Sequence, residues 1–277
     1  DAQIVFDMND PMGQSTCVAC GECVQACPTG ALMPASVLDD GQRGDSKDFD
    51  REVQSVCPYC GVGCQLSFKI KDDKIKYVEG VNGPANENRL CVKGRFGFDY
   101  VHHDHRLTKP LIRRDDAPAK GLNVDPANPL THFREVSWEE ALDVAANGFI
   151  KHRDISGKRI AGFGSAKCSN EEAYLFQKII RQGFGHNNVD HCTRLCHASS
   201  VAALLENVGS AAVTATFNEI ENADVAIVIG ANPTENHPVA ATYFKQFAKR
   251  GGKLIVMDPR GQGLKRHADH MLQFRPG

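Results

Sequence analysis

Three cysteines fall within one short loop of the sequence, and a fourth follows later in the chain. The loop reads CPYCGVGC at residues 57 to 64 and the fourth cysteine lies in RLCVKGRFG, so the set is Cys57, Cys60, Cys64 and Cys91. Three thiolates in one loop and a fourth from a later segment are typical of iron–sulfur ligands. Gly61 and Gly63 give the loop freedom to curl around inorganic sulfide. We predict a 4Fe-4S cluster here.

A second group of four cysteines lies upstream. Residues 17 to 28 read CVACGECVQACP, which places Cys17, Cys20, Cys23 and Cys27 before Pro28. This is the cysteine run of bacterial ferredoxins, whereas zinc sites usually gather two separated pairs of ligands. We therefore favour a 4Fe-4S cluster over zinc. Cys27 either completes this cluster or ligates a neighbouring one whose other cysteines precede Asp1.

Lys93 follows the last cysteine of the central group by two residues. Apolar and polar residues alternate from 66 to 70 and from 75 to 77, with a turn at Asp72 and Asp73, which predicts a β-hairpin that returns Cys91 to the loop. Lys93 would then lie close to the cluster. It is either a solvated lysine or a fixed positive charge that lowers the cost of adding an electron to the cluster.

A cysteine–histidine pair lies in NNVDHCTRLCHASSVAALLENVG, residues 187 to 209. Cys196 and His197 precede a helix that is predicted to begin near Ser199, and the positive end of a helix stabilises a thiolate. Such a cysteine suits a nucleophile or a soft-metal ligand, and His197 suits an acid or base. The alternative is an inert cysteine, the role that we assign to Cys168 and Cys192.

The second half of the chain alternates between apolar strands and amphipathic helices. Capping boxes predict helix starts at Ser137 with Glu140 and at Ser169 with Glu172, on either side of a short strand at 159 to 165. The pattern continues with a helix from Pro238 that ends at Gly251 and Gly252.

Apolar strands at 224 to 230 and 253 to 258 flank the helix that begins at Pro238. This order predicts a parallel sheet with right-handed crossovers. Ligands of such sheets bind beyond the carboxyl ends of the strands, which points to Gly230 to Asn236 and to Asp258 to Arg260 as a nucleotide-type site. The G-x-G-x-x-G fingerprint is absent, so the sheet gives no support for NAD binding.

The composition narrows the class of protein. With 277 residues and 42% hydrophobic content, the chain is expected to form two or three globular domains. Its net charge of -2 gives no case for binding nucleic acid or an anionic membrane. No apolar run reaches the roughly 20 residues that span a bilayer, and we find no signal peptide. Eight of the eleven cysteines form the two quartets, which favours metal ligation in the reducing cytoplasm over disulfides.

The expected fold class is α/β, with a Rossmann-like parallel sheet preceded by two iron–sulfur domains. We expect a ferredoxin-like domain and linker at 1–50, a small β-rich 4Fe-4S domain at 51–110, a connecting segment at 111–135 and the α/β domain at 136–277. The linker prediction rests on the polar composition of residues 35 to 50. The connecting segment lacks any sustained periodicity.

The ordered set of motifs resembles the amino-terminal half of the molybdenum- or tungsten-dependent formate dehydrogenases. The motifs are CPYCGVGC, LCVKG, VDHCTRLCH, VIGANPTENHP and VMDPR, and the resemblance covers nearly the whole chain. It implies a bis-molybdopterin guanine dinucleotide cofactor. The added CVACGECVQACPTGAL resembles the type whose catalytic subunit has a ferredoxin-like extension and works with an NAD-reducing flavin partner.

The resemblance also implies roles for individual residues. The Cys57 group would hold the cluster nearest the pterin, with Lys93 as the bridge between them. Cys196 matches the protein ligand of the metal, which is selenocysteine in some relatives, and His197 matches the neighbouring active-site histidine. The residues that match segments holding one dinucleotide arm are Asn232, Glu235, Asp258 and Arg260. The family's subunit is much longer, and the part that supplies an active-site arginine and the second pterin site lies outside this sequence.

The expected reaction is oxidation of formate to carbon dioxide, or its reverse, with electrons leaving through Lys93, the Cys57 cluster and the Cys17 cluster to a partner subunit. A nitrate reductase of the same superfamily is the closest alternative, although a different residue follows its metal-ligating cysteine. A non-catalytic electron-transfer subunit, like the cluster-bearing arm of respiratory complex I, is the other alternative. The retained Cys196 and His197 argue against it.

Overall fold

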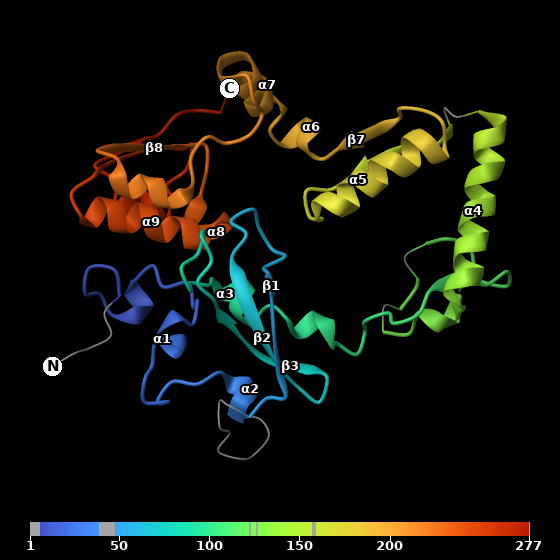
Figure 1. Ribbon diagram of the computed structural model, residues 1–277, viewed down its shortest axis with the longest axis horizontal. Helices are drawn as coiled ribbons and strands as arrows, with labels where there is room; N and C mark the ends of the chain where they lie inside the picture. Colours follow the sequence, from blue (N-terminus) through green and yellow to red (C-terminus); the bar gives the residue numbers. More distant parts are fainter. Residues whose placement is uncertain (1–5, 39–47, 122, 126, 157–158, 277) are drawn as a thin grey trace. The chain divides into compact units, whose positions relative to one another are not determined.

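The computed structural model describes residues 6–38, 48–121, 123–125, 127–156 and 159–276 (Figure 1). The chain divides into two compact units, one made of residues 1–99 with 213–277 and the other of residues 100–212. The boundaries between the four predicted segments stay a prediction. None of the helices in the described ranges is long and apolar enough to cross a membrane.

The first unit holds a small antiparallel sheet that carries the central cysteines. Its strands, in the order in which they pair, are β1 (Arg51–Val56), β2 (Gln65–Lys71) and β3 (Lys74–Gly80). The predicted hairpin is confirmed: Asp72 and Asp73 connect β2 to β3 with φ of 49° and 58°, the left-handed pair that a two-residue turn requires. Helix α3 (Val92–Phe96) follows directly after Cys91.

The same unit contains a three-stranded sheet with the order β10-β9-β8, in which both pairs are parallel. The strands are β8 (Val225–Ile229), β9 (Lys253–Met257) and β10 (His270–Leu272). Helix α9 (Pro238–Lys249) lies against this sheet and has Pro238 at its first turn, as the sequence predicts (Figure 1). The core between them is built from Ala226, Val228, Phe247, Leu254, Val256 and Leu264.

Short helices complete the first unit. They are η1 (Met12–Gln14), α1 (Glu22–Gln25), α2 (Ala35–Leu38), η2 (Asp99–Val101, across the boundary at 99), η6 (Phe217–Asn222), α8 (Pro233–Asn236) and η7 (Gly263–Arg266). Helix α2 falls inside the predicted linker and buries Val37 completely, so the start of that segment is ordered against the domain. Residues 39–47, the middle of the linker, lie outside the described residues.

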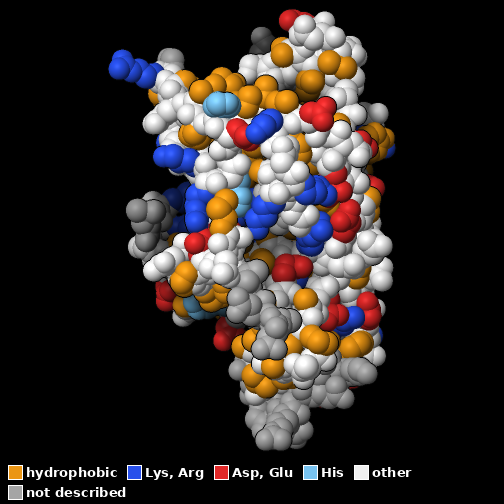
Figure 2. All heavy atoms as spheres, turned by 90° about the vertical axis from the view of Figure 1, so that its left-hand side faces the viewer, with side chains coloured by type: hydrophobic (Ala, Val, Ile, Leu, Met, Phe, Trp, Pro, Cys, Tyr) orange, Lys and Arg blue, Asp and Glu red, His pale blue; other side chains and the backbone are white. Residues whose placement is uncertain are grey.

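The amino-terminal segment contacts helices α9 and η7 through the half-buried carboxylate of Asp7. Asp7 accepts hydrogen bonds from the Thr16 amide at 2.5 Å and the Thr16 hydroxyl at 2.7 Å, and its oxygens lie 3.8 Å from Lys245 and 3.5 Å from Arg266. Burial opposes ionisation of Asp7, but the Thr16 hydrogen bonds and the Lys245 charge outweigh it and lower the pKa. On the face in Figure 2, basic and acidic side chains likewise lie beside one another.

The second unit consists mainly of helices with two short strand pairs. Its helices are α4 (Trp138–Ile155), α5 (Asn170–Lys178), the π-helical turn η5 (Ile179–Gly183), α6 (Thr193–Cys196), α7 (Ala198–Val208) and η3 (Pro129–Thr131). Strand β6 (Gly162–Gly164) pairs in parallel with β7 (Val189–His191). Strand β4 (Leu111–Arg113) pairs antiparallel with β5 (Phe133–Glu135), so the predicted connecting segment carries a strand at each end. Three-residue strands are too short to show a periodicity.

The predicted caps are confirmed to different degrees. At α5, the Ser169 side chain accepts the Glu172 amide at 3.2 Å and the Glu172 carboxylate accepts the Ser169 amide at 2.7 Å, which is a complete capping box. At α4, the Ser137 hydroxyl accepts the Glu140 amide at 3.1 Å. The Glu140 carboxylate pairs with Arg134 rather than with the Ser137 amide, so only half of the predicted box is seen.

Candidate cluster, metal and nucleotide sites

The four central cysteines surround one cavity. Cys57, Cys60, Cys64 and Cys91 line it together with Lys93, Val62 and Leu90, and with Pro238 and Val239 from the first turn of α9. The loop closes because the Cys57 amide donates to the Cys64 carbonyl at 2.8 Å and Gly63 has a φ of 69°. Gly61 does not have a positive φ, so only one of the two predicted glycines has the left-handed conformation. The structure brings together all five residues that the sequence places here.

The environment of these thiols favours their neutral form. Burial, with the neighbouring thiols, raises the pKa of Cys64 to about 12. Burial also raises the pKa of Cys57, while the Tyr59 amide and the Lys93 charge act in the opposite direction. A cation bound among these thiols would therefore stabilise their thiolate form. In the part of the chain that the structure describes, no three acidic, histidine or cysteine side chains are placed to hold a single metal ion.

The ferredoxin-like cysteines are more exposed than those of the central group. Cys17 and Cys23 are exposed, whereas Cys20 and Cys27 are half-buried. Cys27 Sγ lies 3.4 Å from Thr29 Oγ1, and the Thr29 hydroxyl and nearby backbone amides lower the pKa of Cys27 to about 7. Burial has the opposite effect on Cys20, whose pKa is raised. The sequence allows Cys27 either to complete this cluster or to ligate a neighbouring one, and both alternatives stay predictions.

Cys196 and His197 lie at a break between two helices. Cys196 is the last residue of α6, and His197 caps α7 with a φ of -153°. Both side chains are exposed. The predicted helix begins at Ala198, close to the expected Ser199, but a second short helix ends at the cysteine itself. The break leaves the thiol and the imidazole accessible to a ligand.

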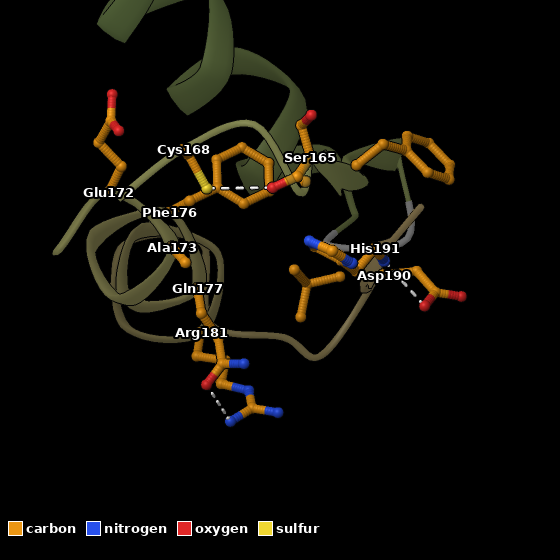
Figure 3. A pocket seen from close by; sticks show the side chains of 12 residues that line it. Ser165, Cys168, Glu172, Ala173, Phe176, Gln177, Arg181, Asp190 and His191 are labelled. Atoms are coloured by element: carbon orange, nitrogen blue, oxygen red, sulfur yellow. Dashed lines mark hydrogen bonds between the residues drawn. The ribbon is translucent and has the colours of Figure 1, made fainter. Parts of the chain in front are cut away.

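A cavity of about 510 Å³ lies within the second unit, at the carboxyl ends of β6 and β7 (Figure 3). Cys168 and Phe176 are on one side and Asp190 and His191 on the other. The Cys168 thiol donates to the Ser165 carbonyl at 3.0 Å. Sequence reasoning missed this cavity and assigned Cys168 and Cys192 to the structural framework, yet both thiols are exposed. The sequence feature that could have revealed the cavity is the strand that ends in glycine at 159 to 165, followed by the capping box of Ser169 and Glu172.

The loops beyond β8 and β9 carry the residues of the predicted nucleotide-type site. Gly230 follows β8 with a φ of 60°. The side-chain amide of Gln262 donates to the Ala231 carbonyl at 2.7 Å, and this hydrogen bond joins the two loops. Asn232 is buried and its Oδ1 accepts the Thr234 hydroxyl at 2.6 Å. Buried Asp258 accepts the Arg260 amide at 2.8 Å.

The remaining side chains at this edge are available to bind a ligand. Glu235, Asn236 and Arg260 are exposed. Gln262 Oε1 is buried without a hydrogen-bond partner among the described residues, which is costly unless a ligand donates to it. Sequence reasoning missed Gln262, although it follows Arg260 by two residues. This set offers charge and hydrogen bonds of both kinds to a polar ligand.

Family models match consecutive parts of the chain. Residues 13–33 match the 4Fe-4S binding domain, residues 50–103 the molybdopterin oxidoreductase Fe4S4 domain and residues 106–277 the molybdopterin oxidoreductase model. The chain belongs to the molybdopterin oxidoreductase family. The resemblance drawn from the motifs is thereby confirmed, and the family implies iron–sulfur clusters and a molybdenum or tungsten molybdopterin.

Individual relatives agree with this family. The chain is 34% identical to the "Probable oxidoreductase YjgC" of Bacillus subtilis and 33% identical to a "Putative formate dehydrogenase" of Staphylococcus haemolyticus, in each case across 99% of the chain and 30% of the relative. It therefore spans about 30% of the length of these curated relatives. Acetylene hydratase from Pelobacter acetylenicus shares the fold, with a TM-score of 0.64 at 20% identity over 79% of this chain and 29% of that one.

Proposed function

We propose that this molybdopterin oxidoreductase chain is part of the catalytic subunit of a formate dehydrogenase. The observation that carries the proposal is the exposed pair of Cys196 and His197 at a helix break, in a chain that also holds two cysteine quartets. An electron-transfer subunit needs only the quartets. The names of the Staphylococcus relatives agree with formate as the substrate.

The residues at each site fit the groups that the family implies. The shared cavity of Cys57, Cys60, Cys64 and Cys91 fits a 4Fe-4S cluster, and the sequence spacing of Cys17, Cys20, Cys23 and Cys27 favours a second. Lys93 lines the first cavity and supplies a positive charge beside it. We infer that Lys93 links this cluster to the pterin.

The orphaned Gln262 oxygen and its neighbours fit a nucleotide arm. We infer that Gly230, Asn232, Glu235, Asn236, Asp258 and Arg260 hold the guanine dinucleotide of one molybdopterin, at the edge of a Rossmann-like parallel sheet. Cys196 is the proposed protein ligand of the metal, because a thiolate suits a soft transition metal. When bound, the molybdenum or tungsten centre supplies the two-electron acceptor.

The chain's own residues orient formate and handle its proton. Oxidation of formate gives carbon dioxide, one proton and two electrons. His197, adjacent to Cys196, orients the carboxylate and accepts the proton. The two cysteine quartets define the route by which both electrons reach a flavin- and iron–sulfur-containing partner that reduces NAD⁺. The same groups serve the reverse reaction, the reduction of carbon dioxide. Cysteines that bind clusters rather than form disulfides favour a reducing compartment, so we propose that the protein lies in the cytoplasm.

Parallel assays of formate and nitrate with the full-length protein test this function. We expect formate-dependent reduction of a dye acceptor and no nitrate-dependent oxidation of a reduced dye. The physical reason is the identity of His197, since the nitrate-reducing relatives are expected to have a different residue after the ligating cysteine. Nitrate turnover without formate turnover would assign the chain to nitrate reduction. The absence of both activities would contradict the proposal.

A further inference from the structure

Arg95 is a buried arginine that joins the two cysteine groups. It lies on α3, four residues after Cys91, and is only 3% exposed. Its guanidinium donates to the Cys20 carbonyl at 2.8 Å and to Gln25 Oε1 at 2.8 Å, and it forms an ion pair with Glu22. One side chain from the central cluster domain therefore contacts three residues of the ferredoxin-like run.

The partners of Arg95 are themselves fixed to the central domain. Glu22 Oε1 also accepts the Leu90 amide at 2.7 Å. The Gln25 side chain exchanges two hydrogen bonds of 3.0 Å with the backbone of Gly80, at the end of β3. Helix α1, which carries Cys23, is thus held at both ends of a single turn.

The backbone of Gly21 lies close against the Arg95 side chain. Gly21 precedes α1 with a φ of 73°, and a Cβ built on it would lie 2.4 Å from Arg95 Cδ. A larger residue at position 21 would displace the guanidinium. Burying a guanidinium is costly unless its donors are satisfied, and here charge-assisted hydrogen bonds satisfy several of them. The contact has the features of a built junction rather than of a surface ion pair.

We propose that Arg95 is a positioning residue that fixes the distance between the two cysteine groups and so sets the rate at which electrons pass from one to the other. A continuous chain of bonds supports this role: the Arg95 amide donates to the Cys91 carbonyl at 3.0 Å, and its side chain donates to the Cys20 carbonyl. The inference rests on the proposed electron route. It adds a residue that no cysteine motif identifies.

The charges at the junction allow position and electrostatics to be separated. Arg95 and Glu22 together are neutral, so the pair holds the two sites without adding net charge. Arg95→Lys keeps the positive charge but loses the planar fork of donors that reaches three partners at once. Glu22→Gln keeps the shape and an acceptor for the Leu90 amide but leaves the Arg95 charge unbalanced.

Arg89→Lys is the matched control. Arg89 lies two residues before Cys91, pairs with Glu87 at 3.3 Å and packs over the Tyr243 ring. None of these partners belongs to the ferredoxin-like run. If any arginine-to-lysine replacement near the cluster changed its properties, Arg89→Lys would show the same change as Arg95→Lys.

The first measurement uses electron paramagnetic resonance of the full-length holoenzyme reduced with dithionite. In Arg95→Lys we expect a weaker spin–spin interaction between the two clusters, with midpoint potentials close to those of the parent protein. In Glu22→Gln we expect the interaction to be kept while both potentials shift upward, because an unbalanced positive charge favours the reduced state. Arg89→Lys is expected to keep the parent spectrum.

The second measurement follows both clusters by rapid freezing after mixing with formate. In Arg95→Lys we expect the Cys57 cluster to be reduced at the parent rate and the Cys17 cluster severalfold more slowly, because the rate of electron transfer falls steeply as the distance between the clusters grows. A spin–spin interaction and a transfer rate in Arg95→Lys equal to those of Arg89→Lys would overturn the role of Arg95. If formate reduced neither cluster in the parent protein, the proposed function would fail, while the dithionite measurement would still decide the role of Arg95.

Discussion

Replacing Cys196 with serine is expected to abolish formate oxidation. The thiol is exposed at the end of α6, where it can reach a metal, and an alcohol is a much poorer ligand for a soft transition metal than a thiolate. Removing even an outer-shell partner of a metal ligand costs about 10- to 100-fold, so loss of the ligand should exceed 100-fold. Formate-dependent dye reduction measures the effect.

Cys192→Ser provides the matched control for this experiment. Cys192 is also exposed and lies four residues earlier on the same segment. Both variants should keep the iron–sulfur signals of the parent protein, because neither cysteine belongs to a quartet. Turnover of Cys196→Ser at the parent rate, or an equal loss in Cys192→Ser, would contradict the assignment of Cys196 as the ligand.

After iron is removed with a chelator under reducing conditions, Cys27 is expected to react with iodoacetamide at least about 100-fold faster than Cys64 at pH 7. The pKa of Cys27 is about 7, so about half of it is thiolate, while a pKa of about 12 leaves only about 10⁻⁵ of Cys64 as thiolate. The higher intrinsic nucleophilicity of the more basic thiolate recovers only about half of the logarithm of this difference. Peptide mass spectrometry measures both rates.

The pH dependence of alkylation separates thiol ionisation from steric access. From pH 7 to pH 9 the Cys27 rate should rise only about twofold, since its titration is half complete, whereas the Cys64 rate should rise about tenfold per pH unit. Because the Cys64 pKa is raised by folding, the native apo state retains a proton that the unfolded state loses above about pH 9. Stability of the apo protein should therefore fall above that pH. Equal alkylation rates of Cys27 and Cys64 at pH 7 would show that burial does not control how fast these thiols react.

Local signals predicted the elements that position the sites. The Ser169 and Glu172 box begins α5, and Pro238 begins α9, because caps and proline act through the backbone of their own turn. The hairpin turn at Asp72 and Asp73 was equally local. Strand β1 was not predicted, because all of its residues are exposed and its sequence, REVQSV, does not show a buried face.

Contacts between distant segments could not be predicted. Arg95 and Glu22 are 73 residues apart, and nothing in the periodicity around either residue indicates that they pair. The same is true of Asp7 and Lys245, which meet only because the amino-terminal segment packs against α9. Such contacts depend on the tertiary fold, whereas caps, turns and cysteine spacing are local.

The candidate site shows the same division. The spacing of Cys57, Cys60 and Cys64 predicted their shared cavity, because three ligands in one loop must lie close together. The buried oxygen of Gln262 was missed, because its lack of a partner depends on the loop after β8 folding against it. The helix break at His197 was also missed, since the residues on both sides favour a helix.

Elemental analysis of the purified full-length protein tests the central claim most directly. The account predicts at least about eight iron atoms for each chain, from two clusters of four, together with about one atom of molybdenum or tungsten. Iron without either heavy metal would make the chain an electron-transfer subunit, and zinc in place of iron would remove the basis for both cluster assignments.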